Sequence, residues 1–237
     1  MRRALTYTIC GMLLLLTMPF ALAGEVIDGI VATVNHKPIF RSDWDDAVRF
    51  EAFMQQKPLH QVSEPDKASA LQRLIDRQLI AAEMGDARYM QPSDEDLQQD
   101  VTKLRAQVPG GAADQSWRKL LAGYGLTDAM LRDHLRTELQ VMNFVEVRLR
   151  PNVHIQPEEI QAYYRDQVLP DLQKTGGKFV SLTEVEPRIR ELLTQQRMDQ
   201  LLDAWLHNLR QQAQIQTSIP IPARETAEDQ VRASGSE

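Results

Sequence analysis

The sequence predicts a mostly α-helical, multi-helix protein with a small β element near the N-terminus and a long C-terminal helix. Three observations predict this fold. Residues rich in Val and Ile surround a turn signal in only one segment, residues 26–40. After Phe40, helix-start patterns recur along the chain, together with apolar stripes at helical spacing. Aromatic residues make up only 6% of the chain, which suits long helices better than a compact sandwich.

The β element consists of two short apolar segments around a turn. Asn35 opens the turn, and Ile39 and Phe40 follow it. We therefore expect two extended segments in this region. Pro38 cannot donate a hydrogen bond to a neighbouring strand, so it restricts the second segment to a sheet edge or a turn. The apolar residues before the turn are Val26, Ile27, Ile30, Val31 and Val34.

Four helix starts are marked by a hydroxyl residue and an acidic residue three positions later. The hydroxyl accepts a hydrogen bond from a backbone amide that has no partner within the helix. The acidic side chain lies at the positive end of the helix dipole. We therefore expect helices to begin at these four places. The pairs are Ser42 with Asp45, Ser63 with Asp66, Ser93 with Asp96, and Thr183 with Glu186.

Three apolar stripes at helical spacing support these helices. The first covers residues 71–82, the second covers 131–149, and the third belongs to a long final helix. That helix is expected to end before Ile215, a residue that can close a short strand. Residues 109–111 separate two helices, and Gly176-Gly177 marks a tight loop. The stripes consist of Leu71, Leu74, Ile75, Gln78, Leu79 and Ala82; Leu131, Leu135, Leu139, Met142, Val145 and Leu149; and Ile189, Leu192, Leu193, Leu201, Leu202, Trp205 and Leu209.

The N-terminus has the three parts of a cleavable signal peptide. Arg2 and Arg3 form a basic start, an apolar run follows, and Ala21 and Ala23 give the spacing that signal peptidase recognises. We expect cleavage after Ala23 and export of the mature chain. The alternative, an uncleaved membrane anchor, fits less well because Pro19 interrupts a run that is short for a bilayer span of about 20 residues.

Cysteine and charge exclude several classes of protein. Cys10, the only cysteine, lies inside the predicted signal peptide, so the mature chain would have no disulfide, thiol nucleophile or thiolate metal site. The formal net charge is −6, and removal of Arg2 and Arg3 makes it about −8. Since no basic block remains, we expect no nucleic-acid partner.

No pattern of residues predicts catalysis. The sequence lacks a zinc-protease motif, a phosphate-binding loop and a serine-hydrolase elbow. Acidic clusters at 43–46, 94–96 and 158–159 fall in first helical turns, where capping and the helix dipole explain them. We predict no catalytic residue, no metal and no cofactor. The histidines, which show no metal-ligand spacing, are His36, His60, His134, His154 and His207.

Methionine and aromatic side chains are the remaining candidates for a binding site. Ordinary core packing is one interpretation of them. The other is an adaptable apolar surface, because these side chains can repack around varied partners. Both interpretations stay open at this point. The candidate client-binding residues are Phe50, Phe53, Met54, Trp117, Tyr124, Met130, Met142 and Phe144.

Three segments together resemble the SurA-type family of periplasmic chaperones. The first, residues 26–44, reads VIDGIVATVNHKPIFRSDW. The second combines LQRLIDRQLIAAEM at 71–84 with the helix start at 92–97 and the helix at 125–150. The third, residues 181–215, begins SLTEVEPRIRELL. The resemblance implies a chaperone core in which the C-terminal helix and strand pack back on the N-terminal domain.

The sequence departs from the family in one respect. In the family, parvulin prolyl-isomerase domains lie between the second and third segments. Here only residues 168–182 separate the helix start at 158–167 from the helix start at Thr183. That length is far below what a folded domain needs. We therefore predict no parvulin domain at this point and no enzymatic activity.

The predicted domain organisation has three parts. Residues 1–23 are the signal peptide, residues 24–217 form a SurA-like chaperone domain, and the polar residues 218–237 form a disordered tail. The chaperone domain consists of an N-terminal part, 24–174, and a C-terminal helix and strand, 181–217.

The resemblance implies an ATP-independent periplasmic holdase that binds unfolded exported or outer-membrane proteins. An alternative is a dedicated subunit that binds one partner in the export or envelope machinery. Prolyl isomerisation is a third possibility, against which the missing domain argues. Cleavage of the signal peptide would leave a protein that is not integral to the membrane. Homodimerisation through the C-terminal helix stays open.

Overall fold

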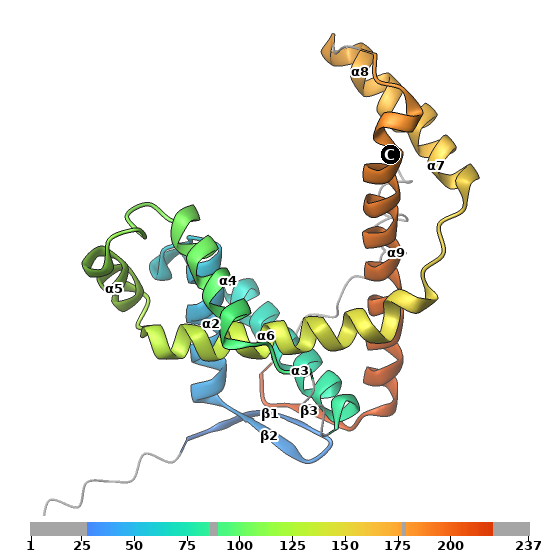
Figure 1. Ribbon diagram of the computed structural model, residues 1–237. Coiled ribbons are helices and arrows are strands. Elements are labelled where there is room, and N and C mark those ends of the chain that lie inside the picture. The colour runs from blue at the N-terminus through green and yellow to red at the C-terminus, as the bar shows by residue number, and fades with distance from the viewer. Residues whose placement is uncertain (1–27, 86–89, 177–178, 220–237) are drawn as a thin grey trace, which may run out of the picture.

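The computed structural model of the protein describes residues 28–85, 90–176 and 179–219 (Figure 1). The predicted signal peptide and residues 220–237 of the predicted tail lie outside these ranges. The prediction of a mostly helical chain with a small sheet near the N-terminus and a long C-terminal helix is confirmed. The helical elements are α2 (Arg41–Met54), η1 (Leu59–Gln61), α3 (Glu64–Met84), α4 (Asp94–Gln107), α5 (Asp114–Gly123), α6 (Asp128–Leu149), η3 (Arg150–Asn152), α7 (Pro157–Tyr163), η4 (Tyr164–Val168), α8 (Leu169–Thr175) and α9 (Leu182–Gln212).

The sheet brings the two ends of the described chain together. Its strands, β1 (Ile30–Val34), β2 (Lys37–Phe40) and β3 (Ile215–Thr217), lie antiparallel in the order β2-β1-β3. Asn35 and His36 have φ angles of 48° and 66°, as a two-residue type I′ hairpin turn requires. The predicted strand at Ile215 is therefore confirmed, and the Pro38 strand, β2, lies at a sheet edge as expected.

Two of the predicted helix starts are confirmed and two are shifted. Ser63 and Ser93 both cap their helices through the expected acidic residue three positions on. Helix α2 begins earlier than predicted, because β2 runs directly into it at Phe40. Ser42 therefore lies in the first turn, where its backbone N–H and hydroxyl bond the Asp28 carboxylate. In α9 the N-cap is Ser181 rather than the predicted Thr183.

Three buried clusters hold the elements together. The aromatic core joins α2, α4, α5 and α6, the sheet core joins the strands to α2 and α3, and a smaller core lies where α3, α6 and α9 meet. The aromatic core is formed by Phe50, Phe53, Leu97, Val101, Leu104, Val108, Trp117, Leu121, Leu126, Leu131 and Leu135. The sheet core is formed by Val31, Ala32, Val34, Ile39, Trp44, Ala70, Leu71, Ile75 and Leu79, and the third by Ile80, Phe144 and Leu206.

Helices α7 and α8 lie along the first half of α9 and project away from the sheet, forming an arm (Figure 1). The buried side chains of Ile160 on α7 and Ile189 on α9 belong to this arm. Arg197 and Glu159 form a salt bridge of 2.7 Å across it. Helix α8 ends at Thr175 and α9 begins at Leu182, so the chain has no room for an inserted domain between them.

The second half of α9 packs back on the body of the protein (Figure 1), as the family resemblance implied. Arg210 Nε donates to Asp76 Oδ1 on α3 at 2.6 Å, and an Arg210 Nη group donates to the Gln72 carbonyl at 3.3 Å. Asp76 is 9% exposed. One guanidinium therefore joins the last helix to the middle of α3, just before the chain enters β3.

Arg210→Ala should destabilise the protein because it removes a cation from a nearly buried carboxylate. The expected loss in the free energy of unfolding is roughly 2–3 kcal/mol, between the values for exposed and buried ion pairs. Urea unfolding of the mature chain measures it. Pairing Arg210→Met with Asp76→Leu should recover much of the loss. Lys103→Ala, which removes one partner of an exposed ion pair within a helix, is the control and should leave the urea midpoint at its wild-type value. A wild-type midpoint for Arg210→Ala would contradict the prediction.

Candidate functional site

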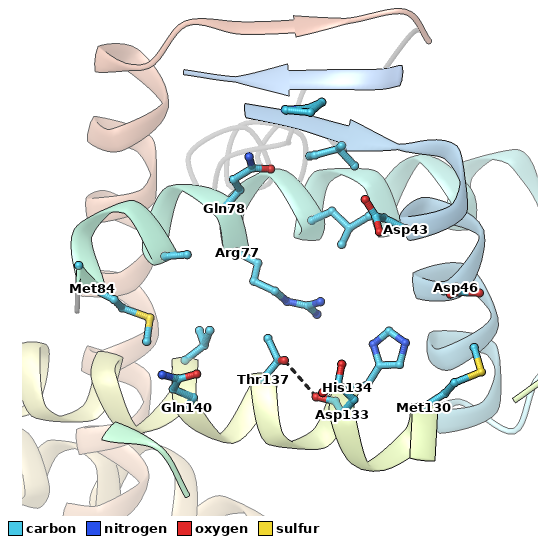
Figure 2. Close-up of a pocket in the computed structure, with 16 residues that line it drawn as sticks. Asp43, Asp46, Arg77, Gln78, Met84, Met130, Asp133, His134, Thr137 and Gln140 are labelled. Atoms are coloured by element: carbon cyan, nitrogen blue, oxygen red, sulfur yellow. Dashed lines mark hydrogen bonds between the residues drawn. The ribbon is translucent and has the colours of Figure 1, made fainter. Parts of the chain in front are cut away.

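The α3–α6 groove is a surface cavity of about 550 Å³ between those two helices (Figure 2). Helix α2 and strand β2 close its other sides. Side chains from α3 and α6 reach it because residues three or four apart lie on one face of a helix. The lining residues are Pro38, Ile39, Asp43, Asp46, Leu74, Arg77, Gln78, Ala81, Met84, Gly85, Met130, Asp133, His134, Thr137, Gln140 and Val141.

Two basic side chains, Arg77 and His134, reach the space between α3 and α6 in this groove (Figure 2). The His134 ring stacks on Phe50, with ring centroids 4.6 Å apart. Burial, together with the nearby Arg77 charge, lowers the pKa of His134 below its ordinary value of 6.5. An Arg77 Nη atom lies 3.4 Å from the Glu138 carboxylate. Burial raises the pKa of Glu138, and the Arg77 charge opposes that shift.

The lining of the α3–α6 groove is mixed in charge and polarity. Asp43, Asp46 and Asp133 lie around Arg77, so acidic groups predominate among its charges. Within residues 28–85, 90–176 and 179–219, no group of three or more potential ligands is placed to hold a metal ion. Most of the remaining lining is apolar, and Gln78 and Gln140 add two amide side chains.

The α5 groove is a second, more apolar cavity of about 720 Å³. It lies between the short helix η1, the loop that precedes α5, and α5 itself. Leu59 on η1 is 38% exposed and forms part of its wall. The lining residues are Pro58, Leu59, His60, Pro109, Ser116, Lys119, Leu120, Gly123 and Tyr124.

Contacts between aromatic rings support Tyr124, a residue that lines the α5 groove. Tyr124 contacts Phe53 edge to face, with ring centroids 5.5 Å apart. Phe53 makes a similar contact with Trp117 at 5.7 Å, and Trp117 Nε1 donates to Asp128 at 3.2 Å. Phe53 and Trp117 are each 2% exposed. Since both rings are packed on all sides, they hold Tyr124 in place at the groove.

Arg105 fixes the loop that forms one rim of the α5 groove. Its Nε donates to the Gly111 carbonyl at 2.7 Å, and its Nη groups bond the Ala112 carbonyl and the Asp114 carboxylate. The guanidinium also lies over the Trp117 ring. At Gly111 an added Cβ would lie 2.2 Å from the Arg105 carbonyl oxygen, so the close approach requires glycine. These contacts hold Pro109 at the rim.

The structure separates the eight candidate residues into three groups. Phe50, Phe53, Trp117 and Phe144 are buried in the cores, as the packing interpretation expects. Tyr124 lines the α5 groove and Met130 lines the α3–α6 groove. Met54 and Met142 are 41% and 64% exposed on helix surfaces.

Several groove residues were missed by the sequence analysis. Leu59 and Leu120 escaped because a single apolar residue in a short segment has no periodic pattern. The dipeptide Pro58-Leu59 was available as a loop signal, but nothing in the sequence placed it beside the Pro109 turn and α5. Arg77 and His134 come from different helices, so their proximity depends on how α3 and α6 pack.

Comparison with known protein families decides where the chain belongs. A family model described as the SurA-like N-terminal domain matches residues 1–145. The chain belongs to this family. The match includes both strands of the hairpin and all elements that line the α5 groove, and it ends within α6. A search of curated proteins finds no match to the chain.

The resemblance stated from the sequence is therefore confirmed at the level of the family. A SurA-like domain of this kind is a chaperone-type domain rather than a catalytic one. Among the helices of the described ranges, none is long and apolar enough to cross a membrane.

Gly111→Ala should destabilise the SurA-like domain because the new methyl group would meet the Arg105 carbonyl. We expect a loss of about 1–3 kcal/mol in the free energy of unfolding, typical of a forced backbone shift. Chemical denaturation measures it. Gly123→Ala is the matched control, since a Cβ there meets nothing within 4 Å and alanine favours a helix. Equal stability of the two variants would contradict the prediction.

His134 should make the stability of the domain depend on pH. Its pKa in the folded state is lowered, so the unfolded state binds its proton first as the pH falls. This contribution is fully present above pH 6.5 and is lost as the pH decreases through that value towards the lowered pKa. Unfolding free energies between pH 8 and pH 5.5 should therefore fall more steeply for wild type than for His134→Gln. If the pH profiles of wild type and His134→Gln run parallel, His134 has the same pKa in the folded and unfolded states and the prediction is wrong.

Proposed function

We propose that this protein is an ATP-independent periplasmic chaperone that holds unfolded exported or outer-membrane proteins. The α5 groove is the observation that carries the proposal. It is open and largely apolar, it rests on a rigid aromatic base, and it belongs to a SurA-like domain. Its volume of about 720 Å³ lies in the range typical of ligand pockets, about 300–1,000 Å³, and suits a few side chains rather than a folded domain.

Binding in such a groove would be reversible and tolerant of sequence. Leu59, Leu120 and Tyr124 offer apolar contact without a ring of buried polar groups that would demand one specific ligand. Met130 in the α3–α6 groove and the exposed Met54 and Met142 offer further adaptable contacts. The negative charge of the mature chain, about −8, would keep client-loaded molecules apart.

The predicted signal peptide, which lies outside the described residues, supports a periplasmic location. Unfolded chains arrive there by export, and a chaperone without cysteine cannot form mixed disulfides with them. The buried candidates Phe50, Phe53, Trp117 and Phe144 would act by supporting the surface rather than by touching a client in this conformation.

The holdase activity is tested by diluting an unfolded β-barrel outer-membrane protein from urea into the mature chain, without ATP. Light scattering should fall at a near-stoichiometric ratio. Leu59→Gln should raise the concentration of the protein that is needed for the same reduction in scattering by about five-fold, because it removes roughly 1 kcal/mol of apolar contact. Val147→Gln is the matched control, since Val147 is 59% exposed and lines neither groove.

Three outcomes would contradict the proposal. Unchanged scattering over a wide range of ratios would exclude a general holdase. Recovery of one stoichiometric partner from cells, without weak binding of many clients, would identify a dedicated assembly subunit. Acceleration of proline-limited refolding at catalytic concentrations would identify an isomerase.

A further inference from the structure

The α5 groove carries positive charge on an acidic protein. The residues that line it include no Asp or Glu, and its basic side chains are Lys119 and His60. The whole chain has a formal net charge of −6. In the α3–α6 groove, by contrast, three aspartates and Arg77 are among the lining residues. The two grooves therefore offer surfaces of opposite charge to a polypeptide.

Lys119 is available to a ligand. Within the described ranges no carboxylate of the protein forms a salt bridge with it, and its side chain is exposed. Of the other described lysines, Lys57, Lys67, Lys103 and Lys174 each pair with an acidic side chain of the protein itself, whereas Lys37, on β2 and outside the α5 groove, likewise forms no salt bridge with a described residue. The groove thus presents an ammonium group next to apolar side chains without neutralising it.

Asp114 on α5 and Asp128 at the start of α6 are both paired with other side chains. Asp114, the acid in the first turn of α5, is held by Arg105 at 2.6 Å. That pairing keeps the pKa of Asp114 below its ordinary value, so it stays ionised and engaged with Arg105. The Asp128 carboxylate bonds Trp117 and Arg132. A carboxylate that pairs with the Lys119 ammonium group would therefore have to belong to a bound chain.

We propose that the α5 groove selects extended apolar client segments that carry an acidic side chain beside the apolar residues. This rests on the proposed chaperone function and adds the class of segment that the groove takes. The apolar residues of the segment pack on Leu59, Leu120 and Tyr124, and its carboxylate pairs with Lys119. Because the ion pair is exposed, the gain in affinity is about two- to five-fold and weakens with salt.

The experiment compares three fluorescent peptides with the same apolar residues and a single central Glu, Gln or Lys. Fluorescence anisotropy with the mature chain measures the dissociation constants at low and high salt. We expect the Glu peptide to bind about three-fold more tightly than the Gln peptide, and the Lys peptide to bind most weakly. The differences should shrink at high salt.

Matched charge reversals locate the effect. Lys119→Glu should reverse the order of the three peptides. Lys103→Glu makes the same change in net charge on α4, at an exposed lysine outside both grooves, and should leave the order unchanged. If Lys103→Glu reverses the order as well, the preference reflects net charge and the proposal is wrong. If Lys119→Glu keeps the wild-type order, the carboxylate binds elsewhere and the proposal is also wrong.

Failure of this proposal can be told apart from failure of the chaperone function. Equal binding of all three peptides, weakened throughout by Leu59→Gln, would leave the groove as a client site but overturn its charge selection. Absence of binding together with absence of aggregation suppression would overturn the chaperone function itself. Thermal unfolding of Lys119→Glu confirms that the exposed substitution leaves the fold intact.

Discussion

The pairing of β1 with β3 is the constraint on which the rest of the structure depends. It joins residues near the start of the described chain to residues after α9, and Gln214 N–H donates to the Asn35 side chain across 179 positions. Arg210 and Asp76 form the adjacent connection between α9 and α3. Together they fix the second half of α9, whose contacts with α3 and α6 complete the core at Ile80, Phe144 and Leu206.

This closure also determines where the two grooves lie. Helix α6 reaches from the aromatic core to α9 (Figure 1), and its side chains form one wall of the α3–α6 groove. The α5 groove is built farther from the closure, on rings packed between α2 and α5. One groove is therefore sensitive to how α9 docks, whereas the other depends mainly on local packing around Trp117.

The sequence predicts the elements better than it predicts the surface. The helix over 128–149 and the strand at Ile215 were found because periodicity and turn residues are local signals. The exposure of Met142 was not found, because beyond Leu139 helix α6 packs on α3 and α9 through Val141, Phe144 and Val145, and Met142 lies outside that contact. Leu59 and Lys119 meet only through tertiary packing, so local pattern could not bring them to one groove.

Under the proposed export, the position of β3 at the far end of the fold would set an order of assembly. A chain that crosses the membrane from its N-terminus would deliver β1 early and β3 only after α9 had emerged. Until then β1 has β2 on one side and an open hydrogen-bonding edge on the other. The domain would complete its sheet by a late, long-range step, which is slow compared with helix formation. A protein that would protect newly exported chains thus passes through the same exposed state as its clients.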